Sequence, residues 1–218
     1  MTTPDHAAAV DATLKSLYPR ASIALTYATD FQLLVAVILS AQTTDVGVNK
    51  VTPVLFERFA TPEALAEADP AHVEEIVRPT GFFRNKTKNI IGAARRIVAE
   101  YGGRVPDTME DLITLPGVAR KTANIVLYNA FGTAEGVAVD THVSRLSQRL
   151  GLSSHTDPDK IERDLMALFP REEWGPLTYR LIEHGRAVCD AKRPICGQCT
   201  LSGICPSAFT VKGWRERG

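Results

Sequence analysis

The sequence is poor in several features that would assign it to common protein classes. It has no cysteine before position 189, its aromatic residues make up 7% of the chain, and its 25 basic side chains are balanced by 25 acidic ones. The longest purely apolar run, Leu33 to Leu39, is far shorter than the roughly 20 residues needed to cross a bilayer. The opening residues, Met1 to His6, contain no basic segment that leads into an apolar one. We therefore expect a globular, cytoplasmic protein that makes no membrane contact.

The charges are balanced in number but uneven along the chain. Residues 84–104 carry six basic side chains and one acidic one, whereas residues 57–78 carry six acids and two arginines. Zero net charge neither requires nor excludes a polyanionic partner, because the local arrangement of charge decides such binding. The length of 218 residues allows one large domain or two small ones.

The pattern of the chain is helical throughout. A capping residue followed by proline, which favours a helix start, occurs at 61–62, 69–70 and 157–158, and a variant capping box begins at Thr108. Alternation of apolar and polar residues is not sustained anywhere, and there is no Asn-Gly or Asp-Gly hairpin turn. We predict an all-α fold of roughly ten short helices. Leu33 to Leu39 is apolar on every side, which predicts a central, buried helix.

All four cysteines lie within 17 consecutive residues. They are Cys189, Cys196, Cys199 and Cys205. Disulfides are disfavoured because the sequence shows no secretory signal. A structural zinc site usually offers two close Cys pairs, and only Cys196 and Cys199 form one; four thiolates from one looping segment also suit an iron-sulfur cluster. The spacing alone leaves zinc and iron-sulfur open.

A glycine-containing turn at 115–123 separates two predicted helices. Such a turn presents free backbone N–H groups at the amino end of the next helix, which makes Gly117, Ala119 and Arg120 candidates for binding an anion. Lys121 opens that helix, where the helix dipole and the neighbouring Arg120 both disfavour an ammonium and favour a nucleophilic amine. The alternative is that this turn only connects the two helices.

Asp140 opens the following helix, where its simplest role is an N-cap. A helix over 121–131 is about 16 Å long, and the roughly eight extended residues after it can reach back ~26 Å. The amino ends of the two helices can therefore face one cleft, in which an amine and a carboxylate would meet. The glycines at 132 and 136 mark the crossing between two helical lobes.

Four segments together resemble the bacterial endonuclease III family, the helix-hairpin-helix DNA glycosylases of base excision repair. They are residues 38–45, the hairpin at 115–123, the segment 139–143 and the cysteine spacing, and the resemblance spans roughly residues 10–207. It implies a six-helix barrel lobe over 24–134. It also implies a second helical lobe over 1–23 and 135–218 that carries a 4Fe-4S cluster, with DNA in the groove between the lobes. The partner implied is double-stranded DNA that contains damaged bases or abasic sites, and we expect a monomer.

The resemblance also implies roles for individual residues. Lys121 matches the lysine that attacks C1′ of an extruded damaged nucleotide and forms a Schiff base, after which β-elimination cuts the strand. Asp140 matches the carboxylate that stabilises positive charge on the sugar. Gln42 matches the residue that fills the hole left by the base, although on its own it is a polar turn residue after the buried helix. The four cysteines match the cluster ligands.

Two positions depart from the usual family pattern. Ala119 stands where a second hairpin glycine is common, which puts the geometry of the hairpin in question. Phe82 stands where leucine is often found in the loop that wedges into the duplex, which puts the substrate range in question. If positive φ were required at Ala119, alanine would be strained; we expect negative φ there and a turn at Gly117 instead.

Lys192 and Arg193 lie inside the first cysteine loop. A cluster would hold this loop rigid, so that we expect these two cations to make fixed phosphate contacts rather than a solvated face.

Two other functions remain open. One is a monofunctional, adenine-specific type of mismatch glycosylase, which usually lacks the lysine at the Lys121 position. The other is a DNA-binding module without catalysis that uses a zinc site as scaffolding. Oxidised pyrimidines are the substrates that the resemblance implies.

Overall fold

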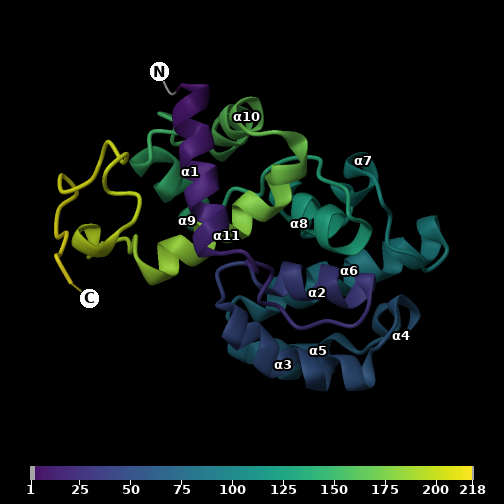
Figure 1. The fold of residues 1–218 in the computed structure, drawn as a ribbon. Helices are drawn as coiled ribbons and strands as arrows, with labels where there is room; N and C mark the ends of the chain where they lie inside the picture. Colours follow the sequence, from purple (N-terminus) through teal and green to yellow (C-terminus); the bar gives the residue numbers. More distant parts are fainter. Residues whose placement is uncertain (1–2, 218) are drawn as a thin grey trace. The chain divides into compact units, whose positions relative to one another are not determined.

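The computed structural model describes residues 3–217 and contains helices without strands in this range (Figure 1). The predicted all-α fold is confirmed. The helices are α1 Pro4–Leu17, α2 Asp30–Leu39, α3 Asp45–Arg58, α4 Pro62–Ala66, α5 Pro70–Val77, α6 Phe83–Tyr101, α7 Met109–Leu112, α8 Arg120–Phe131, α9 Thr141–Arg149, α10 Pro158–Leu168 and α11 Trp174–Ala187. Short 3-10 turns lie at η1 Arg78–Thr80, η2 Arg171–Glu173 and η3 Cys196–Gln198. No helix within 3–217 combines the length and apolarity that a membrane crossing requires.

Local capping explains where several helices begin. The side chains of Thr61, Asp69 and Asp157 each accept a backbone N–H from the first turn of the helix that follows. Thr108 caps α7 in the same way through the N–H of Asp111. All four of these predicted helix starts are confirmed.

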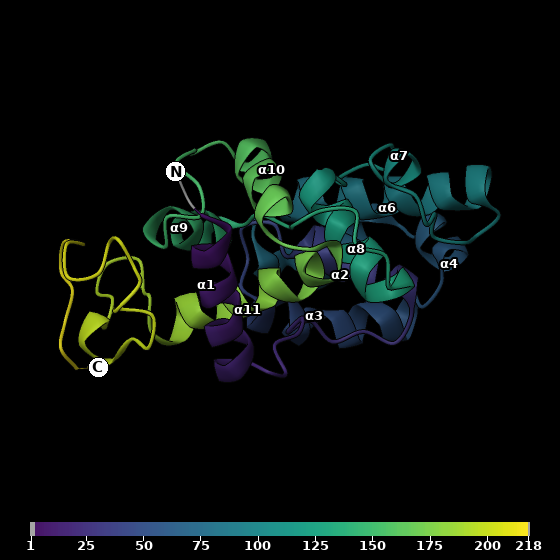
Figure 2. The same cartoon turned by 45° about the horizontal axis from the view of Figure 1, so that its top comes forward.

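The chain divides into two compact units. One, here called the inner unit, is Ala24–Thr133; the other, the terminal unit, comprises the described parts of Met1–Ile23 and Ala134–Gly218. Within the inner unit α2 packs against α3, α6 and α8, and its residues from Leu33 to Leu39 are all buried. Figure 2 shows α2 between α3 and α8. The central position predicted for this apolar helix is confirmed.

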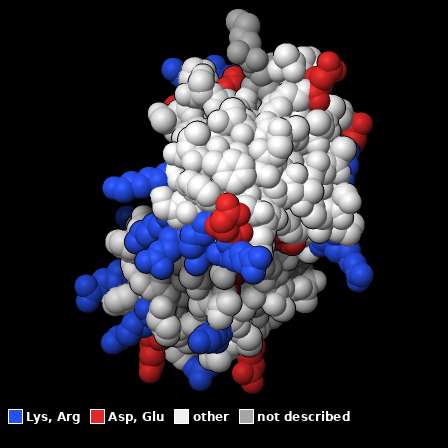
Figure 3. Space-filling view, turned by 60° about the vertical axis from the view of Figure 1, so that its left-hand side comes forward, with Lys and Arg blue, Asp and Glu red and all other residues white. Residues whose placement is uncertain are grey.

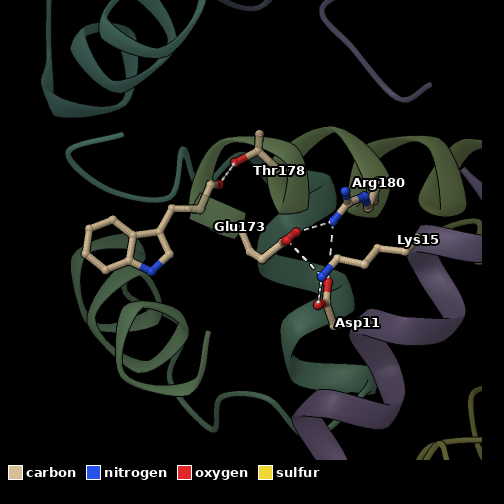
Figure 4. Close-up of polar contacts among 6 residues, drawn as sticks. Asp11, Lys15, Glu173, Thr178 and Arg180 are labelled. Carbon is tan, nitrogen blue, oxygen red and sulfur yellow. Dashed lines mark hydrogen bonds and ion pairs between the residues drawn. The ribbon is translucent and has the colours of Figure 1, made fainter. Parts of the chain in front are cut away.

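The terminal unit joins the first helix to the last ones. Its core includes Leu14 of α1, Leu146 of α9, Ile161 of α10 and Leu181 of α11. Beside this core, charged side chains bridge α1 to the segment that begins α11 (Figure 4). Lys15 Nζ lies 2.7 Å from Asp11 and 2.8 Å from Glu173, while Arg180 Nη1 lies 2.5 Å from Glu173 and 3.4 Å from Asp11.

The network in Figure 4 is a ring of two cations and two carboxylates, in which each charge faces two of the opposite sign. The hydrogen bonds that Lys15 donates to Asp11 and Glu173 raise the pKa of Lys15. Such mutual compensation lets α1 pack against α11 although charged groups lie at the contact. After α11, residues 188–217 run in loops that hold one short 3-10 turn, η3.

Candidate active site and cysteine-lined cavity

The hairpin between α7 and α8 turns at Gly117. This glycine has φ of +81°, in the left-handed region, and a Cβ built on it would lie 2.9 Å from Cβ of Asn89 on α6. Both the backbone conformation and the close approach to α6 therefore require glycine. Leu115 and Val118, on either side of the turn, are buried and anchor it to the inner unit.

Ala119 is the N-cap of α8, with φ of −101° and ψ of 172°. The expected negative φ at this position is confirmed, and Ala119 directly precedes the first turn of α8. The helix begins at Arg120, one residue before Lys121. Alanine has no side-chain acceptor, so it cannot cap the first-turn N–H groups of α8, and an anion can take that place. Arg120 and Lys121 are both exposed at this end.

Gln42 and Phe82 occupy two loop tips of the inner unit that share an uncommon backbone. Gln42 has φ of +54° and Phe82 has φ of +47°, and both side chains are exposed, Phe82 to 67%. Left-handed conformations are uncommon outside glycine, and they concentrate at functional sites. Nothing in the sequence signals this conformation at either position.

A buried lysine lies behind these two tips. Lys86 is 3% exposed, and its Nζ donates to Thr43 Oγ1 at 2.6 Å and to the Thr80 carbonyl at 2.7 Å. Burial lowers the pKa of Lys86. From the sequence Lys86 counts only as one of the basic residues of 84–104, because lysine is usually a surface residue.

Two arginines flank the base of the Phe82 tip. The guanidinium carbons of Arg78 and Arg84 lie 5.4 Å and 5.3 Å from the centre of the Phe83 ring. Cation–π contacts of this length hold the two positive charges next to Phe82. The tip therefore combines an exposed aromatic ring with flanking cations.

Asp140 is the N-cap of α9 in the terminal unit. Its Oδ1 accepts the backbone N–H of Val143 at 2.7 Å, which is the capping role predicted for it. Lys121 belongs to the inner unit, whereas Asp140 belongs to the terminal unit. The shared cleft therefore stays a prediction.

The four cysteines surround one cavity in the terminal unit. They are free thiols and line this cavity together with apolar residues such as Leu150, Ile195 and Val211. Burial raises the pKa of the Cys199 and Cys205 thiols. Within residues 3–217, no three His, Cys, Asp or Glu side chains form a group that would hold a single metal ion.

Arginines of α9 brace the loop that carries Lys192 and Arg193. Arg149 donates to the carbonyls of Asp190 and Ala191 at 2.7 Å and 2.8 Å, and it lies 3.4 Å from Cys189 Sγ. Arg145 donates to the Cys189 carbonyl at 3.2 Å. The sequence offers no signal for these contacts, because each spans about 40 positions.

Asp190 holds the same loop from within. Its Oδ1 accepts the backbone N–H groups of Arg193 and Lys192, each at 2.9 Å, and these bonds lower the pKa of Asp190. The side chains of Lys192 and Arg193 are exposed. The backbone that carries these two cations is therefore fixed by hydrogen bonds of its own.

A buried histidine touches the cysteine cavity. His184 Nε2 lies 3.5 Å from Cys199 Sγ, and Nδ1 lies 3.0 Å from the Tyr18 hydroxyl. Burial lowers the pKa of His184 to about 4, so the ring is neutral near pH 7. His184 therefore packs beside the cysteines as a neutral ring.

Positive charge gathers locally in spite of the neutral total. On the face shown in Figure 3, Lys and Arg side chains form a band with few acidic side chains among them. Along the chain, residues 186–217 hold six basic side chains and two acidic ones. A band of this kind attracts a polyanion at short range.

Comparison with known proteins gives relatives along nearly the whole chain. Residues 35–171 match the family model described as HhH-GPD superfamily base excision DNA repair protein. Endonuclease III of Synechocystis sp. is 60% identical over 195 residues, which cover 89% of each chain. Endonuclease III of Bacillus subtilis is 42% identical over 87% of this chain and 86% of its own.

Solved structures agree with the sequence relatives. A non-covalent endonuclease III–DNA complex aligns with a TM-score of 0.92 and 39% identity, covering 96% of this chain and 98% of that one. A trapped endonuclease III–DNA covalent intermediate aligns equally well, covering 99% of its own chain. The helical fold, the hairpin before α8 and these likenesses lead to one conclusion: the chain belongs to the endonuclease III family of the HhH-GPD superfamily.

Proposed function

We infer that this protein is a bifunctional DNA glycosylase and AP lyase of base excision repair, acting on oxidised pyrimidines in duplex DNA. The observation that carries the inference is Lys121, an exposed amine at the amino end of α8, directly after a turn whose backbone can bind phosphate. The likeness to a trapped covalent endonuclease III–DNA intermediate supports a covalent mechanism.

In this mechanism Nζ of Lys121, as the free amine, attacks C1′ of the extruded nucleotide. The new N–C1′ bond replaces the glycosidic bond, and the damaged base leaves with the bonding electron pair and takes up a proton. The sugar ring opens to a Schiff base. Loss of a proton from C2′ then expels the 3′ phosphate by β-elimination, which cuts the strand.

Asp140 would stabilise the positive charge that develops on the sugar during base loss. Its Oδ1 accepts the N–H of Val143, so the direction of the carboxylate is fixed by α9. We propose that Lys121 is the nucleophile and Asp140 the charge-stabilising carboxylate, with Gln42 and Phe82 at the duplex opening. Gly117, Ala119 and Arg120 would face the phosphates, as would Lys192 and Arg193.

We propose a 4Fe-4S cluster held by Cys189, Cys196, Cys199 and Cys205. The donor set fits, because four thiols surround one cavity and thiolates are the ligands that iron-sulfur clusters use. Bound iron would keep the thiolates ionised and would fix the loop of Lys192 and Arg193. His184, neutral at pH 7, can then donate from Nε2 to Cys199 Sγ and accept from Tyr18 at Nδ1. Cluster assembly and the action on DNA would place the protein in the cytoplasm.

One duplex that contains an oxidised pyrimidine tests the activity. The protein should cut the strand and become covalently trapped by borohydride. Lys121→Gln should abolish both while specific binding is largely kept, and Lys160→Gln, an exposed lysine of α10, serves as control. Base removal without trapping would support a monofunctional enzyme, binding without base removal a module without catalysis, and trapping of the Lys121 variant would show a different nucleophile.

A further inference from the structure

Two loop tips of the inner unit are joined by one buried ammonium group. Thr43 directly follows Gln42, and Thr80 lies two residues before Phe82. Lys86 Nζ donates to both threonines, to the hydroxyl of Thr43 and to the carbonyl of Thr80. The Thr43 hydroxyl also donates to the Thr80 carbonyl at 2.5 Å. The three residues thus form a closed triangle between loops about 40 positions apart.

The triangle lies next to residues whose backbone has an uncommon, left-handed conformation. Gln42, Gly81 and Phe82 have φ of +54°, +68° and +47°. Non-glycine residues keep such conformations only when their surroundings impose them. Phe82 has no capping acceptor of its own, and its ring is exposed to solvent, so little besides the neighbouring backbone holds this tip in place.

The composition of the triangle is unusual for a purely structural contact. Its cation is 3% exposed, and both acceptors of Lys86 are neutral oxygens. Removing a charge from water costs free energy, which an apolar side chain of similar volume would not incur. A lysine has a different advantage here. Its ammonium group has three N–H donors, so that it can hydrogen-bond to several oxygens at once and fix their positions.

We propose that Lys86 is a positioning residue that holds the Gln42 and Phe82 tips together as one preformed wedge for opening the DNA duplex at the lesion. The inference rests on the proposed function and adds a specific residue to it. The cations of Arg78 and Arg84 on the Phe83 ring would contact phosphates next to the wedge. Because the two tips are already ordered in the free protein, DNA binding does not incur the loss of conformational entropy that ordering them would cost.

The wedge matters only when the DNA must be opened. A duplex with an oxidised pyrimidine requires base extrusion, whereas an abasic site in a single-stranded oligonucleotide offers C1′ to Lys121 without it. The ratio of the rates on these two substrates therefore separates duplex opening from chemistry.

Lys86→Met keeps an unbranched side chain that is one atom shorter and removes the ammonium group. We expect this variant to cut the lesion duplex at least about tenfold more slowly, the factor expected for a lost charge-assisted hydrogen bond. Borohydride trapping on the single-stranded abasic site should stay within about twofold of the wild type, because Lys121 and its helix are unchanged. Lys160→Met, an exposed lysine in the terminal unit, should match the wild type on both substrates.

A second variant keeps the test valid if Lys86→Met does not fold. Thr43→Val removes the hydroxyl while keeping the shape, and it should slow the duplex reaction selectively in the same way. Because both residues act through one network, the double variant should be no slower than the slower single variant. A fluorescent base placed opposite the lesion should report delayed opening in each.

Three outcomes would overturn the inference: equal slowing on both substrates, an unchanged duplex rate in Lys86→Met, or additive effects in the double variant. These outcomes differ from a failure of the proposed function, in which the wild-type protein itself would show no trapping on either substrate.

Discussion

At Ala119 one methyl group stands where the family pattern commonly has glycine. The φ of −101° at this position is open to any residue, so the methyl group causes no backbone strain. The turn that needs positive φ lies two residues earlier, at Gly117. The departure from the common pattern therefore leaves the course of the hairpin intact, which sequence alone could argue but not decide.

We predict that Ala119→Gly lowers the free energy of unfolding by about 0.4–1 kcal/mol. The cause is the greater freedom that glycine gives the unfolded chain, since the native conformation suits alanine. Thermal melts of the two forms measure the difference. A higher midpoint for the glycine variant would mean that the alanine hairpin is strained.

Asp140 combines two roles that substitutions can separate. Asparagine and serine both cap helices about as well as aspartate, so Asp140→Asn and Asp140→Ser should change the melting temperature little. Both remove the negative charge, and base removal should slow by about 10²–10³-fold, the usual loss when one electrostatic stabiliser is removed. Single-turnover rates with melts on the same samples test this. A normal rate in either variant would limit Asp140 to capping.

Among the elements, α9 has the most connections to proposed functional groups. Asp140 caps its amino end, and its arginines at 145 and 149 donate to the carbonyls of Cys189, Asp190 and Ala191. The helix thereby ties the proposed catalytic carboxylate to the first cysteine loop within the terminal unit. Close packing against α11 reinforces it, since a Cβ on Gly185 would lie 2.8 Å from both Arg145 Nη2 and His142 Nδ1.

The braced loop leads to a prediction about salt dependence. If Lys192 and Arg193 each neutralise one phosphate, the double alanine variant should reduce the slope of log affinity against log salt by about 1.8. The loop itself should persist, because Asp190 binds the backbone N–H groups and not the side chains. Binding titrations at several salt concentrations provide the slope, with Lys160→Ala as control. An unchanged slope would show that this loop does not touch DNA.

For the whole molecule, sequence predicts the features whose causes are local. Caps such as Thr61 and Asp157 act on their own next turn, and the apolar run before Leu39 has no polar face to expose. Features that depend on distant partners were not predictable. Lys86 is buried by loops from two other parts of the chain, and the left-handed backbone of Phe82 comes from packing that its residue type does not reveal.

The terminal unit provides the last prediction, because its final segment has so little structure of its own. From Val188 to Arg217 the only helical element is the short turn η3, and the four cysteines line the cavity that this segment encloses together with Arg149, Leu150 and His184. Ordering so long a segment costs conformational entropy that the hydrogen bonds of its turns and loops alone offset poorly. A bound cluster would supply the missing stabilisation, since metal binding to an unformed site contributes directly to folding.

We therefore expect purified protein to be brown and to contain about four iron atoms and four inorganic sulfides per chain, as a 4Fe-4S cluster requires. Cys196→Ser should lower solubility and melting temperature before it alters chemistry at Lys121, because the cysteine belongs to the terminal unit and the lysine to the inner one. Iron and sulfide analysis, together with melts and single-turnover rates of the soluble fraction, tests both statements. Stoichiometric zinc without iron in protein from its native source would contradict the cluster. A variant that loses chemistry at full stability would show that the cysteines act on the reaction directly.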